Sequence, residues 1–183
     1  MIKLLTVFWN IILRKSGPEE VPDSNFLLVM TFIFFLLSQI LVGFKMYQGA
    51  VSLFFQLLFL DTVLLIIWLR AILQLSGKLE RFRQSLTALF GTGTLFNFIL
   101  SPFMLFYAPY LEQLTSSDEL QIAAELPVPA LLGVVILVIA IWSVLVMGHI
   151  FSRATSKSRA IGLGMALVYS FINFMISTSF QVA

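Results

Sequence analysis

The sequence predicts an all-α integral membrane protein with five membrane-spanning helices, preceded by an amphipathic helix at the membrane surface. The first observation is composition: 60% of the residues are hydrophobic, only 11% are charged, and the mean hydropathy is +1.01. No ordinary soluble domain has such a composition. Second, five apolar stretches approach the roughly 20 residues that cross a bilayer. Third, the basic residues gather on one side of the resulting topology.

The first predicted element is a helix over residues 1–15. Its polar residues Lys3, Thr6, Asn10 and Arg14 recur at helical intervals, which places them in one stripe of an otherwise apolar helix. About 13 residues are too few to cross the bilayer, and no small-residue cleavage site follows them. We therefore expect an interfacial helix, with a cleaved signal peptide as the alternative.

A linker is expected at residues 16–24, because Pro18 and Pro22 interrupt helical structure. Asp23 or Ser24 is placed to cap the first span. Residues 25–183 then form the membrane domain, with predicted spans at residues 26–44, 51–69, 86–107, 130–151 and 160–176. In the third span, a proline at residue 102 is expected to kink the helix or to end its regular part.

The charges predict the orientation of these spans. With a cytoplasmic amino terminus, ten of the eleven Lys and Arg residues fall on the cytoplasmic side and only Lys45 falls outside, as the positive-inside rule requires. The connection over residues 108–129 contains acidic residues and no basic one. We predict a cytoplasmic amino terminus, an external carboxyl terminus and an external acidic loop.

Asp61 lies near the middle of the second span. A carboxylate at that depth costs about 2.5 to 3.5 kcal/mol, so we expect it to face the interior of the bundle. Small and polar residues line one face of the third and of the fifth span, where helices can approach closely and form hydrogen bonds. The sequence therefore predicts a buried polar cluster. Its members are Asp61, Asn97, Ser101, Ser170 and Asn173.

Two interpretations of this cluster stay open. A carboxylate without a basic partner could exchange protons or bind a cation, which is typical of a small proton-coupled transporter or channel centred on Asp61. Alternatively, a neutral or amide-bonded Asp61 fixes the register of helix packing. Since the spans contain no second carboxylate and no basic residue at that depth, we favour the packing interpretation.

Few residues could carry enzymatic chemistry. Cysteine is absent and His149 is the single histidine, which argues against metal and haem sites, so no cofactor is expected. His149 has no orienting acid on its own helix face, and we predict no enzyme. Gly91 and Gly93 follow no predicted strand, so they indicate close packing rather than nucleotide binding. No nucleic-acid partner is expected.

Basic residues gather in two predicted cytoplasmic connections. We expect them to form one basic surface that attracts anionic lipid at about 1 kcal/mol per charge, although the positive-inside rule alone would also place them there. They are Lys78, Arg81, Arg83, Arg153, Lys157 and Arg159.

Two segments of the chain resemble the Yip family, the five-span membrane proteins known for interacting with Rab GTPases. They are Leu75–Gly93, with Gly77, Lys78, Phe82, Gln84 and Ser85 as matching positions, and Ile141–Leu167, with Trp142, Gly148, His149, Ser158 and Ala160. The resemblance extends over roughly residues 26–175. It implies a five-helix bundle with a cytoplasmic amino terminus and a non-enzymatic role in organising membranes or assembling membrane proteins.

The chain is most similar to compact bacterial members of that family, because an interfacial helix stands where eukaryotic members have a long cytoplasmic region. The Rab-binding role is therefore not carried over. We expect a scaffold, accessory or assembly subunit in the bacterial inner membrane, with the lipid bilayer and another membrane protein or a second copy of itself as partners.

Overall fold

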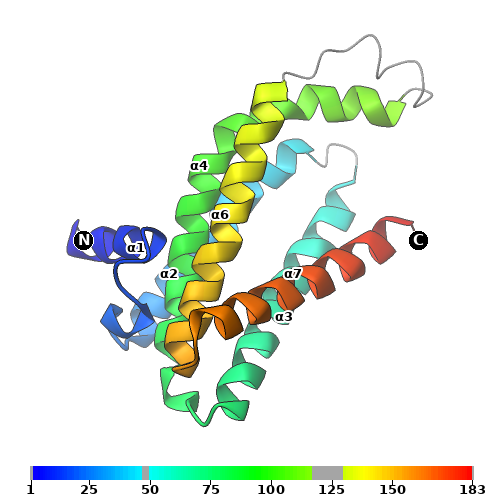
Figure 1. Cartoon of the computed structure of the whole chain (residues 1–183). Coiled ribbons are helices and arrows are strands. Elements are labelled where there is room, and N and C mark those ends of the chain that lie inside the picture. The colour runs from blue at the N-terminus through cyan, green and yellow to red at the C-terminus, as the bar shows by residue number, and fades with distance from the viewer. Residues whose placement is uncertain (1, 47–49, 117–129, 183) are drawn as a thin grey trace.

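The computed structural model describes residues 2–46, 50–116 and 130–182, and these residues form helices and no strands (Figure 1). The six α-helices are α1 (Ile2–Ile12), α2 (Asn25–Met46), α3 (Val51–Leu75), α4 (Phe82–Ser116), α6 (Ala130–Thr155) and α7 (Arg159–Val182). Two short 3-10 turns, η1 (Pro18–Glu20) and η2 (Leu79–Arg81), precede α2 and α4. The predicted all-α class is confirmed.

Four helices are long and apolar enough to cross a membrane, which makes the chain a multi-pass membrane protein. They are Val51–Leu75, Leu79–Ala108, Leu131–Thr155 and Arg159–Phe180, and they correspond to the second to fifth predicted spans. The first predicted span is α2, a helix of 22 residues. Its described apolar part, Asn25–Leu41, is shorter than the other four.

The helices extend beyond the predicted spans, because hydropathy marks the hydrocarbon region whereas helical hydrogen bonding continues into polar sequence. The second span, predicted to end at residue 69, continues to Leu75. The third continues to Ser116, so residues 108–116 are helical and not part of the expected acidic loop. The rest of that loop, residues 117–129, lies outside the described residues.

The predicted linker is also more ordered than expected. Residues 18–20 form η1, and Val21 is almost fully buried. The Ser24 hydroxyl accepts a hydrogen bond from Leu27 N at 3.4 Å and so caps α2. The segment is a folded connection that lies against α4 and α6.

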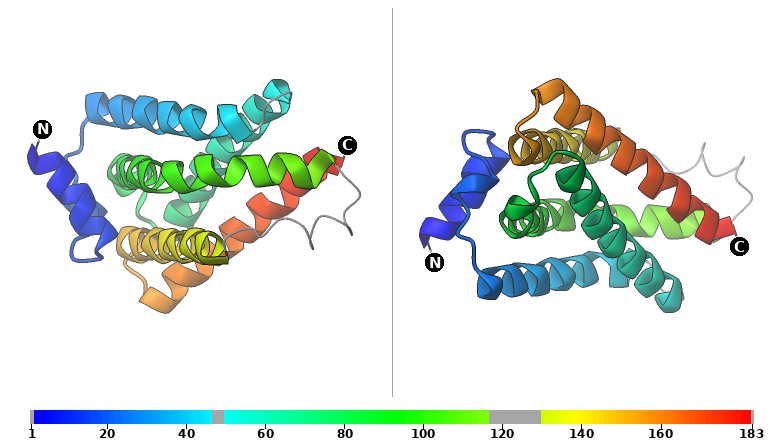
Figure 2. Two further views of the ribbon diagram at one scale, coloured as in Figure 1. Left: turned by 90° about the horizontal axis from the view of Figure 1, so that it is seen from above. Right: turned by 90° about the horizontal axis from the view of Figure 1, so that it is seen from below.

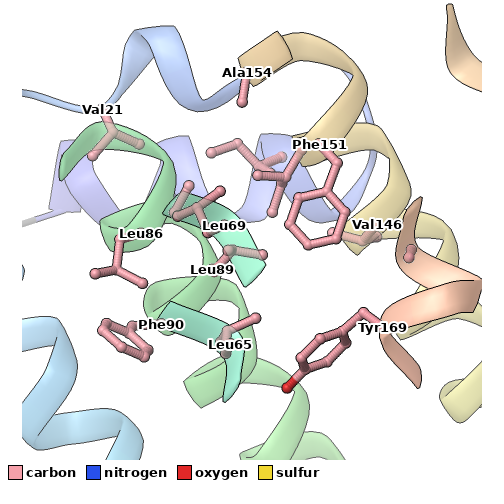
Figure 3. Packing of buried hydrophobic residues seen from close by; sticks show 14 of the residues in the cluster. Val21, Leu65, Leu69, Leu86, Leu89, Phe90, Val146, Phe151, Ala154 and Tyr169 are labelled. Atoms are coloured by element: carbon pink, nitrogen blue, oxygen red, sulfur yellow. The ribbon is translucent and has the colours of Figure 1, made fainter. Parts of the chain in front are cut away.

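The buried side chains gather at one end of the bundle, where α1, α3 and α6 finish and α4 and α7 begin. We call this the basic end, because it carries most of the Lys and Arg residues. The largest fully buried side chains there are Ile11, Val21, Leu69, Leu73, Phe90, Val146, Ile150 and Phe151. Figure 3 shows several of them converging. Away from this end, α3 and α7 lean away from α4 and α6 (Figures 1 and 2).

All three helices that finish at the basic end close in the same way. Each is followed by a residue in the left-handed region, Arg14 (φ 56°), Gly77 (φ 65°) or Ser156 (φ 56°). The next amide then reaches back five residues, from Lys15 to Asn10 O (2.9 Å), Lys78 to Leu73 O (2.9 Å) and Lys157 to Ser152 O (3.0 Å). This is the Schellman closure, which satisfies the last carbonyl groups of a helix.

Helix α1 lies across α4 and α6 rather than parallel to them (Figures 1 and 2). Phe8, Ile11 and Ile12 are buried in the bundle. A Cβ atom at Gly91 of α4 would lie 2.5 Å from the ring of Phe8, so the glycine allows this close approach. Trp142 Nε1 donates a hydrogen bond to Ile12 O at 3.2 Å and fastens the end of α1 to α6.

Helix α4 changes direction along its length (Figure 1), and it contains Pro109 and, where a kink was predicted, Pro102. A proline has no N–H to donate to the carbonyl group four residues earlier, which for Pro102 is that of Phe98. The Ser101 hydroxyl donates to Phe98 O instead, at 3.1 Å. Ser101 therefore satisfies the carbonyl group that Pro102 leaves free.

Helices α6 and α7 approach most closely at two glycines. A Cβ atom at Gly148 would lie 2.8 Å from Leu163 Cα, and one at Gly162 would lie 2.6 Å from Ser152 N and closer still to Gly148 O. Because these neighbours are backbone atoms, they cannot move aside without separating the helices. The α6–α7 crossing therefore requires glycine at both positions.

We predict that Gly162→Ala lowers the free energy of unfolding by about 1 to 3 kcal/mol, the usual cost of forcing extra atoms into a packed contact. Gly164→Ala, on the same helix, is the matched control, because nothing lies within 4 Å of the position that its new Cβ atom would take. Unfolding would be followed by tryptophan fluorescence in mixed micelles with increasing dodecyl sulfate. Equal stability of the two variants would contradict the proposed close contact.

Candidate functional site

Asp61 of α3 binds two side chains of α7. Its Oδ1 atom accepts hydrogen bonds from the hydroxyl group of Tyr169 at 2.7 Å and from Nδ2 of Asn173 at 2.9 Å. The two donors are four residues apart and therefore share one face of α7. Tyr169 is almost fully buried, beside Leu65 and Val146 (Figure 3). The predicted contact between Asp61 and the polar stripe of the fifth span is thus present at Asn173.

A hollow of about 480 Å³ lies beside this contact and is lined by residues of α2, α3, α4, α6 and α7. Four residues of the predicted polar cluster line it: Asp61, Asn97, Ser170 and Asn173. Its other polar lining residues include Gln39 of α2, and no Lys, Arg or His residue belongs to the lining. The hollow therefore has polar side chains among its apolar ones and no positive charge to match Asp61.

Asn97 and Ser101, which we predicted beside Asp61, bind elsewhere. Asn97 Nδ2 donates to Ser38 Oγ at 2.9 Å, and Ser38 donates in turn to Phe35 O at 2.7 Å. This chain joins α4 to α2. Ser101 binds Phe98 O within α4 and does not line the hollow. The polar stripe of the third span thus joins α4 to α2, whereas that of the fifth span joins α7 to α3.

The sequence analysis missed two residues of the site, Tyr169 and Ser38. Tyr169 precedes Asn173 by four residues, so helical spacing alone could have placed it on the face toward Asp61. Ser38 follows Thr31 by seven residues, which puts both on one face of α2, and both are almost fully buried. An apolar span with two polar residues at this interval indicates a packed face.

The contact can do three things chemically. It can join α3 to α7 through hydrogen bonds to one carboxylate oxygen, hold a proton, or present oxygen atoms to a small cation. Asn173 Oδ1 is a further acceptor, which is buried and has no hydrogen-bond partner among the described residues. Within the described part of the chain, no three His, Asp or Glu side chains gather in a way that could hold a metal ion.

The basic surface predicted from the sequence is partly used to join chain segments. Arg81 donates to Arg153 O at 3.1 Å and to Ser156 Oγ at 2.9 Å, which ties the α3–α4 connection to the α6–α7 connection. Arg83 forms an ion pair with Asp23 at 2.8 Å. Arg153 forms an ion pair with Glu19. Three of the six predicted basic residues therefore hold the connections together.

The other three predicted basic residues, Lys78, Lys157 and Arg159, have no ion-pair partner within the ranges that the structure describes. His149 lies nearby on α6, with Nε2 at 2.8 Å from Ser16 O. Because a carbonyl oxygen can only accept, Nε2 carries the proton. His149 thus holds the connection after α1, a role that the sequence did not indicate.

Comparison with models of protein families gives no match, and no curated protein and no solved structure matches the chain. The resemblance to the Yip family therefore stays a prediction.

We predict that Tyr169→Phe lowers the free energy of unfolding by about 0.6 to 2 kcal/mol, the usual contribution of a hydrogen bond between membrane helices. When Asp61→Leu is already present, Tyr169→Phe should lower the free energy of unfolding very little, because the hydroxyl group of Tyr169 then has no acceptor to lose. Ser170→Ala, a hollow-lining change with no hydrogen bond to lose, is the control. Dodecyl sulfate unfolding of the wild type, the two single variants and the double variant of Asp61 and Tyr169 measures the coupling energy between these two residues. Additive effects of the two changes would show that the bond contributes nothing.

Proposed function

We propose that the chain is a non-enzymatic scaffold or accessory subunit of a membrane, which binds another membrane protein or a second copy of itself at its basic end. In this proposal it has five spans, a cytoplasmic amino terminus and an external carboxyl terminus. Its place is the bacterial inner membrane, as the resemblance to compact Yip-type proteins implies.

The length of α2 supports a fifth span. A helix of 22 residues is about 33 Å long at 1.5 Å per residue, against roughly 30 Å of hydrocarbon. The distribution of charge supports the orientation, because five spans place ten of the eleven basic residues on one side. The exposed apolar stripe of α1, formed by Leu5 and Trp9 and continued by Leu13 just after the helix, supports its location in the membrane interface.

The observation that carries the proposal is the way in which the basic end is held together. Residues far apart in the chain join here through Arg81, Arg83 and Arg153, so the segment before α2 and two helical connections form one surface. A surface fixed before binding loses little conformational entropy when a partner docks. Lys78 and Lys157 remain without ion-pair partners in the described chain and can attract an acidic partner.

The contacts of three titratable side chains at the basic end support a non-enzymatic role. His149, Glu19 and Asp23 each bind a residue that is far away in the sequence. Each thus fastens one chain segment to another. A general acid or base needs to reach a substrate, whereas these three groups are engaged in holding the basic end.

We predict that the full chain, purified in a mild detergent, is recovered with a stoichiometric membrane partner or as a defined oligomer. Lys78→Glu should reduce this recovery about tenfold, because it reverses a charge on the proposed docking surface. Lys3→Glu makes the same change on the first turn of α1 and is the matched control. Light scattering and mass spectrometry would measure the mass and the subunit composition of the purified particle. A wild-type monomer without a partner would contradict the proposal.

A small proton-coupled transporter or channel is the second candidate, and the hollow beside Asp61 is the observation that favours it. The hollow brings Asp61 together with Asn97 and with the oxygen of Asn173, which has no hydrogen-bond partner in the described ranges. A carboxylate beside polar side chains within a membrane is the usual centre of such a pathway.

If this second function is present, vesicles containing the chain will conduct protons or cations and Asp61→Asn will abolish the flux. Asparagine keeps an oxygen that can accept from Tyr169 but cannot exchange a proton in the same range. Ser170→Ala is the control for a change in the wall of the hollow. Flux would be followed with a pH-sensitive dye under an imposed potential. Wild-type vesicles without flux would rule out this function.

A further inference from the structure

Two hollows adjoin at the basic end, where the end of α1 meets α6 and the start of α7. The larger one, of about 660 Å³, is lined mainly by charged and polar side chains. The smaller one, of about 330 Å³, is lined by Leu13, Leu145 and Leu163 among others. Arg14, His149 and Arg159 line both. A basic hollow therefore continues into a smaller one that is lined by three leucines and by the same three basic residues, and that we call the apolar hollow for its leucines.

The charge of the larger hollow is strongly unbalanced. Six of its lining residues are Lys or Arg and one, Glu19, is acidic. Glu19 is already paired with Arg153. Lys15, Lys157 and Arg159 have no ion-pair partner in the described ranges. Three cations around one hollow repel one another unless an anion lies among them.

The backbone adds to this preference for an anion. Helix α7 begins at Arg159, and the first N–H groups of a helix have no partner within it. The hydroxyl of Ser158 caps one of them, the amide of Ile161, at 3.4 Å. The positive end of the helix dipole thus lies at the hollow together with the three cations.

An anion that fills both hollows needs an apolar part as well as a charged one. A free phosphate ion would occupy the basic hollow and leave the apolar one unused. A phospholipid has both parts, because its phosphate group is joined through glycerol to acyl chains. The side chain of Arg14 is placed between the two, with its guanidinium group 4.9 Å from the ring of Trp142. That cation–π contact restricts the guanidinium group of a side chain that lines both hollows.

We propose that this pair of hollows binds one anionic phospholipid, with the phosphate among Lys15, Lys157 and Arg159 and the first part of an acyl chain against Leu145 and Leu163. The site requires that the basic end lies at a membrane surface. It does not depend on the scaffold function, since a lipid can occupy it whether or not a protein partner binds.

The test uses the full chain, stripped of lipid and held in an uncharged detergent. Native mass spectrometry and the fluorescence of the tryptophans would follow titration with phosphatidylglycerol, phosphatidylcholine and glycerol phosphate. We expect one phosphatidylglycerol to bind. Phosphatidylcholine should bind more weakly because its headgroup carries no net charge, and glycerol phosphate should bind more weakly because it has no chains.

Two double variants distinguish lipid binding at this site from a general attraction of lipid to surface charge. Lys157→Gln with Arg159→Gln should weaken phosphatidylglycerol binding roughly 30-fold, on the order expected for two basic residues near a lipid surface. Lys3→Gln with Arg70→Gln removes the same charge outside the lining of either hollow and should change binding less than about twofold. Equal weakening by the two pairs would overturn the proposal, as would wild-type protein that binds no phosphatidylglycerol.

A third variant tests the apolar half. Ala160 is exposed and lines the smaller hollow, so Ala160→Trp can fill that space without replacing a buried side chain. We expect it to weaken phosphatidylglycerol binding and to leave the unfolding transition of lipid-free protein unchanged. If glycerol phosphate binds as tightly as phosphatidylglycerol and Ala160→Trp changes neither, the ligand is a free phosphate compound and the lipid assignment is wrong.

Discussion

The contact between Gly148 and Gly162 is the constraint on which the rest of the structure depends. It sets the distance and register between α6 and α7, because each glycine faces backbone atoms of the other helix. A helix transmits that register rigidly, so it also fixes where Tyr169 and Asn173 lie, up to 11 residues or about 16 Å further along α7. Gly148 and Leu163 line the apolar hollow as well. One crossing thus positions both the hydrogen bonds to Asp61 and the proposed lipid site.

Polar groups in this protein serve mainly to join helices, and the two halves of the bundle do so differently. Within the apolar helices, uncharged donors bind across single helix pairs, as Asn97 does with Ser38 and Tyr169 with Asp61. At the basic end, charged side chains bind carbonyl groups and carboxylates of distant segments, as Arg81 does with Arg153 O. This division follows from solvation. A charged side chain costs little free energy at the edge of a membrane and a large amount within it.

The sequence predicted the helices well and their contacts only in part. Helical spans follow from hydropathy, which needs no partner, and Asp61 with Asn173 follows from the cost of a buried charge. Asn97 lines the hollow beside Asp61 but donates its hydrogen bond to Ser38 of α2, because a stripe of polar residues shows which face is buried but not which neighbour its donors bind. Ser101 could not be assigned from its stripe, because its hydroxyl group binds Phe98 O, the carbonyl group that Pro102 leaves free. Arg81 and Arg153 could not be paired because long side chains near connections reach many acceptors.

The position of α1 has a consequence for the order in which the protein is made. Its buried face needs α6, since Ile12 O binds Trp142, which follows it by 130 residues, and Glu19 binds Arg153, which follows it by 134. At ribosomal rates of about 5 to 20 residues per second, these partners emerge on the order of 10 s later. During that interval only the part of α1 that packs on α4, where Phe8 meets Gly91, can be covered by protein, and the part that packs on α6 has only lipid. Helix α1 is therefore synthesised before the helices that cover it and reaches its final place after them.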